Sequence, residues 1–133
     1  KDWLLGHNLK NIHYFGKVSP DVLKTYYRAS DVFLSLANVD FGFGKTAVEA
    51  MFNNLPLISY NIKGMDEIIY NGKNGFLVEK ADIVGVVDIV RKLFDDDALK
   101  KKITKNAYDS VVEKFELNNV TDNLISFYER IRK

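Results

Sequence analysis

The sequence has 133 residues, of which 47% are hydrophobic and 28% charged, a composition typical of one globular domain with one core. Its formal net charge is +1, which gives no reason to expect a nucleic-acid partner. It has no cysteine, which excludes disulfides and thiolate metal sites and fits the cytoplasm. No apolar run reaches the ~20 residues of a membrane span. The chain begins at Lys1 without a methionine, so we expect an excised piece of a longer protein.

Strands are predicted to alternate with helices along the chain. Ser19 and Pro20 indicate a helix start by capping and by proline at the first position. The predicted strands span 11–16, 31–36, 55–60 and 75–78. Helices are predicted at 19–29, 45–54 and 65–70. Three further helices carry apolar stripes: Ile83, Val87, Val90 and Phe94; Leu99, Ile103, Ala107, Val111 and Phe115; and Leu117, Val120, Leu124, Phe127 and Ile131.

This alternation predicts an α/β domain, a Rossmann-like and mostly parallel sheet covered by helices, over residues 1–133. In such sheets ligands bind at the carboxyl ends of the strands. The loops expected to form a site are therefore 16–18, 37–46, 61–65 and 79–82.

A glycine-bearing loop, 40–46, lies between a predicted strand and a predicted helix. Glycines allow close backbone approach to a ligand, and the free N–H groups of a helix's first turn favour an anion. A diphosphate would suit this place, although a plain tight turn explains the spacing equally well. Gly44-Lys45-Thr46 imitates the end of a phosphate-binding P-loop, but that motif needs glycine where Val39 stands.

Glu49 lies one turn into the helix that follows, among apolar residues. It is either a functional carboxylate or part of a solvated face with Lys45 and Asn53, which are spaced by four residues. Periodicity alone does not separate these interpretations.

The ordered set of motifs resembles the retaining, group-1 (family 4-like) nucleotide-sugar glycosyltransferases over nearly the whole chain. The matching pieces are 11–16, with Tyr14 in place of a phenylalanine; 23–34, with Ser30 in place of an alanine; Phe43-Gly44 through Glu49-Ala50-Met51; 55–58; and Gly64, 67–69, 71–72 and 74–78. This resemblance implies a partial C-terminal domain of the GT-B fold that lacks two upstream strands. Strand 11–16 would then pair directly with 31–36, detach, or recruit a strand from another copy, and direct pairing is expected as the cheapest outcome.

The resemblance also implies roles for individual residues. Glu49 would accept hydrogen bonds from the ribose hydroxyls of the donor, a task that suits a carboxylate. The remaining donor-binding residues would be Gly16, Lys17 and Val18 beside the base, Gly42, Phe43 and Gly44 beside the sugar, and Lys45 and Thr46 beside the diphosphate.

Two further departures from the family fall in or near the expected site. The first of two motif glutamates is replaced by Phe41, and Lys63 replaces a glycine. We expect Asp40 to take the place of that glutamate as the catalytic-site carboxylate and to point into the cleft. The alternative is a non-catalytic binding module that has lost this contact.

For the intact enzyme, the resemblance implies transfer of a sugar from a nucleotide-diphosphate sugar to a glycan, lipid or polysaccharide precursor. No metal or other cofactor is expected. The partners would be the donor and the missing N-terminal domain of the same chain, in the cytoplasm or peripherally at the membrane. The chain alone is expected to be inactive, because the basic pair that balances the diphosphate and the acceptor cleft would lie upstream.

Overall fold

The computed structural model describes residues 10–37 and 44–131. Three strands and five helices are assigned within these ranges. In chain order they are α2 (Pro20–Ala29), β1 (Phe33–Ser35), α3 (Lys45–Phe52), β2 (Leu57–Tyr60), β3 (Phe76–Val78), α4 (Ile83–Asp95), α5 (Asp97–Phe115) and α6 (Leu117–Ile131).

The three strands form one parallel sheet in the order β1-β2-β3. Ile58 in the central strand aligns with Leu34 on one side and with Phe76 on the other. All four residues of β2 are buried, as expected for a parallel strand with neighbours on both sides. The predicted α/β class with a parallel sheet is therefore confirmed.

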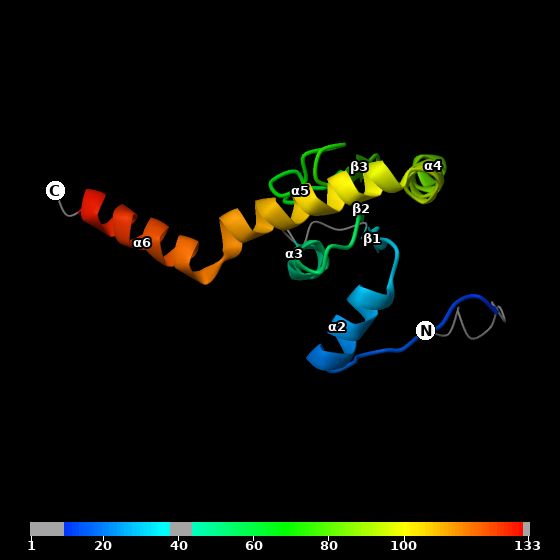
Figure 1. Ribbon diagram of the computed structural model, residues 1–133, viewed down its shortest axis with the longest axis horizontal. Helices are drawn as coiled ribbons and strands as arrows, with labels where there is room; N and C mark the ends of the chain where they lie inside the picture. The colour runs from blue at the N-terminus through cyan, green and yellow to red at the C-terminus, as the bar shows by residue number, and fades with distance from the viewer. Residues whose placement is uncertain (1–9, 38–43, 132–133) are drawn as a thin grey trace.

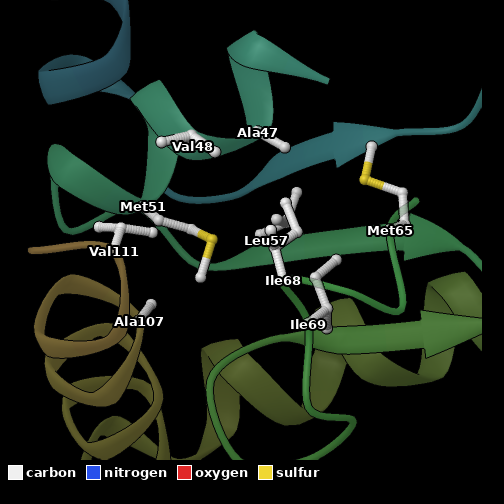
Figure 2. Packing of buried hydrophobic residues seen from close by; sticks show 9 residues of the cluster. All are labelled: Ala47, Val48, Met51, Leu57, Met65, Ile68, Ile69, Ala107 and Val111. Atoms are coloured by element: carbon white, nitrogen blue, oxygen red, sulfur yellow. The ribbon is translucent and has the colours of Figure 1, made fainter. Parts of the chain in front are cut away.

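Helices cover this small sheet (Figure 1). Helix α3 packs on β1 and β2, α4 packs on β3, and α5 packs against both α3 and α4. Buried apolar side chains from α3, β2, the 65–69 segment and α5 meet in one cluster, which Figure 2 shows. Its members are Ala47, Val48, Met51, Leu57, Met65, Ile68, Ile69, Ala107 and Val111.

Gly44 fixes how α3 begins. Its φ of +63° lies in the left-handed region, and an added Cβ would come within 3.1 Å of the Met65 side chain. Both facts favour glycine, which has no Cβ and adopts positive φ without strain. The Gly44 carbonyl then accepts from the N–H groups of Ala47 and Val48 and starts the helix.

The prediction of a strand at 11–16 is wrong. These residues carry no strand assignment and are exposed, and the Phe15 ring instead contacts Tyr26 of α2 at 4.8 Å between centroids. The favoured outcome, direct pairing with 31–36, is therefore absent, and β1 pairs with β2 alone among the described residues. The segment is detached from the sheet, which was one of the alternatives. An apolar pattern gives strand propensity, but a strand forms only where a partner accepts its hydrogen bonds.

Two further expectations need correction. Residues 63–68 form successive turns, not a helix at 65–70. In α4 the buried side chains are Val86 and Leu93, whereas Ile83 and Phe94 from the predicted stripe are 58% and 59% exposed. This helix is apolar on more than one side, so its periodicity did not determine which side packs on β3.

The last two helices behave differently from each other. The predicted stripe of α5 is confirmed, with Ile103, Ala107 and Val111 buried at its centre. The stripe of α6 is exposed throughout, and Figure 1 shows this helix extending away from the sheet. No helix in 10–37 or 44–131 has both the length and the apolar content that a membrane span needs.

Candidate functional site

A pocket of about 370 Å³ lies between the start of α2 and the polar face of α3. Val18, Pro20 and Leu23, just before and within the first turn of α2, form part of one wall. Lys45 and Glu49 of α3 form part of the other. The full lining comprises Val18, Pro20, Leu23, Lys24, Tyr27, Lys45, Glu49 and Asn53.

Local sequence places α2 beside this pocket. The Ser19 side chain caps the helix by accepting from the Val22 N–H, and Pro20 occupies the first turn. Further along, Tyr27 packs against Ala50 of α3 and Leu55, with Leu23 against the same cluster. The apolar face of α2 therefore packs against α3. This packing places the first turn of α2 beside the pocket.

Glu49 is the centre of the polar contacts in the pocket. The Tyr27 hydroxyl donates to Glu49 Oε2 at 3.2 Å. Lys45 Nζ lies 3.7 Å from Glu49 Oε1, and the Glu49 side chain is 34% exposed. A carboxylate in this setting has one buried partner and one solvated partner, and it remains accessible to a ligand.

The pKa of Tyr27 reflects this environment. Burial, together with the hydrogen bond and negative charge of Glu49, raises the pKa of the Tyr27 phenol from 10.0 to about 12. All three causes act in the same direction because each disfavours a phenolate. The phenol therefore keeps its proton, and its hydrogen bond to Glu49, to a higher pH than an ordinary tyrosine does.

This shift predicts a pH dependence of stability. Because the folded-state pKa of Tyr27 is raised, its contribution is fully present below pH 10 and is lost as pH rises through about 12. Between these values, the free energy of unfolding should fall more steeply for the wild type than for Tyr27→Phe. Urea unfolding at several pH values tests this, since the other tyrosines and the lysines titrate in both proteins. Parallel curves for the two proteins would contradict it.

Glu49 lies on a solvated polar face of α3, and it also lines the pocket. The Lys45–Glu49 ion pair is present, and Asn53 Nδ2 donates to the Glu49 backbone carbonyl at 2.8 Å. The three residues thus share one polar face, as the solvated-face interpretation predicts. That same face lines the pocket, so a solvated position does not exclude a functional one.

The structure brings together Val18, Lys45 and Glu49 among the predicted site residues. Gly44 and Thr46 flank the start of α3, and Thr46 is exposed. Gly16 and Lys17 lie in the exposed stretch before α2 and do not line the pocket. The predictions for Asp40, Gly42 and Phe43 fall outside the described residues.

Sequence reasoning missed the role of Tyr27 in this pocket. Tyr27 belongs to one of the family's motif pieces, and that motif places a tyrosine near the end of a helix. The motif does not indicate that this tyrosine contacts Glu49, which lies 22 positions later. Lys24 and Asn53 also line the pocket without having been predicted as donor-binding residues. In the part of the chain that the structure describes, no group of three or more His, Asp or Glu residues could hold a metal ion.

The parallel sheet covered by helices belongs to the Rossmann-like class of α/β folds. The family model for glycosyl transferases group 1 matches residues 1–110. The chain therefore belongs to the group 1 glycosyltransferase family.

Individual relatives agree with this assignment. The chain is 31% identical to N-acetyl-alpha-D-glucosaminyl L-malate synthase of Bacillus anthracis, over 92% of this chain and 32% of that protein. The crystal structure of the C-terminal domain of a group 1 glycosyl transferase, LpcC of Francisella tularensis, matches with a TM-score of 0.68 and 30% identity, over 80% of this chain and 53% of that one.

A third similarity concerns the fold alone. The structure of HepE of Anabaena in complex with UDP-glucose matches with a TM-score of 0.83 at 20% identity, over 97% of this chain and 35% of that one. The chain spans roughly a third of the length of the first curated relatives that it matches, between 28% and 37%.

Proposed function

We propose that this chain is the C-terminal, donor-binding domain of a glycosyltransferase of the GT-B fold, and that residues 1–133 form one such partial domain. The observation that carries the proposal is Glu49, a carboxylate that lines a pocket at the start of the helix after the glycine-bearing loop. A carboxylate in this place can accept hydrogen bonds from two adjacent hydroxyls of a ribose.

The other pocket residues suit the remaining parts of a nucleotide-sugar. Helix α3 begins at Lys45, and the first-turn N–H groups of a helix favour an anion such as a diphosphate. Val18, Pro20 and Leu23 give the opposite wall an apolar surface on which a base could lie. Gly16 and Lys17, just before this wall, would edge the base, while Gly42, Phe43 and Gly44 would face the sugar.

The proposed reaction is retaining transfer of the sugar to an acceptor. Departure of the nucleoside diphosphate leaves positive charge on the sugar ring and negative charge on the diphosphate. Groups fixed near the diphosphate lower the barrier by stabilising the charge that develops there. The start of α3 would supply part of this stabilisation, and Asp40 would hold the sugar hydroxyls that Phe41 cannot bind.

The acceptor is proposed to be a glycan, lipid or polysaccharide precursor, and the expected compartment is the cytoplasm. A second candidate is a nucleotide-sugar-binding module without catalytic activity. The observation that favours it is Phe41, which stands where the family has a glutamate. Both candidates require the donor pocket, and they differ only in turnover by the intact protein.

Nucleotide binding is the direct test. Calorimetric titration of the intact protein with UDP, GDP and ADP should show binding of at least one of them without added metal. A transfer assay on the same protein then separates the enzyme from the binding module. If none of the three nucleotides binds, the pocket between α2 and α3 is not a donor site.

A further inference from the structure

The two oxygens of the Glu49 carboxylate have different kinds of partner. Oε2 accepts a hydrogen bond from the Tyr27 hydroxyl at 3.2 Å. Oε1 lies 3.7 Å from Lys45 Nζ, and the Lys45 side chain is 90% exposed. Among the residues that the structure describes, one oxygen is therefore held by a buried residue of another helix, while the other lies near a solvated ammonium group on its own helix.

Tyr27 is well suited to fix the position of a carboxylate. Its side chain is 6% exposed, and its ring packs edge-on against Phe33 at 5.8 Å between centroids. The hydroxyl also lies 3.4 Å from the Thr46 carbonyl. A phenol has one proton to donate, and the carboxylate is the nearer and charged acceptor, so Glu49 is the stronger partner.

The Lys45 contact is different in strength. An exposed i,i+4 ion pair contributes little and is screened by salt, so ligand hydroxyls can replace it at small cost. Breaking the Tyr27 contact would leave a buried hydroxyl with only the longer Thr46 contact, which costs more. A ligand should therefore exchange with Lys45 at Oε1 and leave Tyr27 on Oε2.

We propose that Tyr27 is the positioning residue of the donor site: it holds Glu49 Oε2 so that Oε1 is presented to the ribose hydroxyls of the nucleotide. This inference rests on the proposed function and adds separate roles for the two carboxylate oxygens of Glu49. It assigns to α2 a part in recognising ribose as well as in shaping the pocket.

The test compares ribonucleotides with their 2′-deoxy forms in the intact protein. Whichever of UDP, GDP and ADP binds most tightly is titrated beside its 2′-deoxy analogue, in the wild type, Tyr27→Phe and Tyr26→Phe. The phenylalanine at 27 keeps the ring and its contact with Phe33, so the fold should be retained. Tyr26→Phe is the matched control, because it removes the hydroxyl of the neighbouring tyrosine on the same helix.

The wild type should prefer the ribonucleotide by about tenfold or more, the scale of a charged hydrogen bond. In Tyr27→Phe this preference should shrink roughly 3- to 10-fold, the scale of one lost hydrogen bond, and in Tyr26→Phe it should be unchanged. A merely structural role for Tyr27 would weaken both nucleotides equally and leave their ratio at the wild-type value, which would overturn the inference.

A second variant shows whether the effect passes through Glu49. In a Glu49→Gln background, Tyr27→Phe should no longer alter the ratio, and an undiminished change there would overturn the inference. If the wild type binds both nucleotide forms equally, the ribose role of Glu49 fails with it. If the wild type and Tyr27→Phe prefer the ribonucleotide over its 2′-deoxy form to the same extent, the role of Tyr27 is rejected. The proposed function is then unaffected.

Discussion

Replacing Glu49 with glutamine is expected to weaken the binding of a nucleotide-sugar donor to the intact protein by about 1.5–3 kcal/mol. The substitution keeps the shape of the side chain but removes its charge. A neutral amide has one acceptor oxygen in place of two and binds hydroxyls less strongly than a carboxylate. Because Tyr27 already occupies one oxygen of Glu49, the glutamine cannot satisfy both the tyrosine and the ribose well.

The measurement is a calorimetric titration of wild type and Glu49→Gln with the same donor. Glu129→Gln is the matched control, since it makes the same chemical change on the exposed surface of α6, away from the pocket lining. Unchanged donor affinity in Glu49→Gln would show that the carboxylate does not contact the donor, and the function of the pocket would then need another explanation.

The site illustrates what one sequence can and cannot predict. Glu49 stood out because it follows a glycine-bearing loop and is surrounded by apolar residues, both of which are local features. Tyr27 did not, because its contact with Glu49 depends on how α2 packs against α3. The hydroxyl reaches the carboxylate only after Leu23 and Tyr27 have docked on Ala50 and Leu55.

The fold shows the same limit. The stripe of α5 was predicted because its apolar residues recur at steps of four on one face, and Ile103 and Val111 are indeed buried. In α4, apolar residues occur on more than one side, so packing on β3 selected Val86 and Leu93 instead of the predicted set. Residues 11–16 have the composition of a strand, but strand pairing is a long-range property that a local pattern does not contain.

The absence of pairing between residues 11–16 and β1 leaves apolar side chains exposed. Strand β1 pairs with β2 on one side, and Leu34 in β1 is 45% exposed. In residues 10–37 and 44–131 no strand pairs with the other side of β1, and such an edge can accept a further strand. Ile12, Tyr14 and Phe15 are 52%, 60% and 61% exposed in the segment that was expected to pair there. These exposed surfaces fit the proposal that this chain is one part of a larger protein.

The chain alone is therefore expected to show no sugar transfer. The pocket between α2 and α3 is proposed to hold a donor, but transfer also needs an acceptor beside the sugar and charge beside the departing diphosphate. The proposed division of the site places the acceptor cleft and the basic pair in the N-terminal part of the protein. Because reaction rate depends on all of these groups acting together, losing them should abolish turnover even where donor binding survives.

Purified chain and intact protein would be assayed side by side with several nucleotide-sugars and acceptors, and binding of the nucleotide measured in parallel. The expected result is binding by both and transfer by the intact protein alone. Adding the N-terminal part as a separate polypeptide is the informative control, since restored turnover would locate the missing groups there. Turnover by the chain comparable to that of the intact protein would mean that residues 1–133 hold a complete active site, and the proposed division would be wrong.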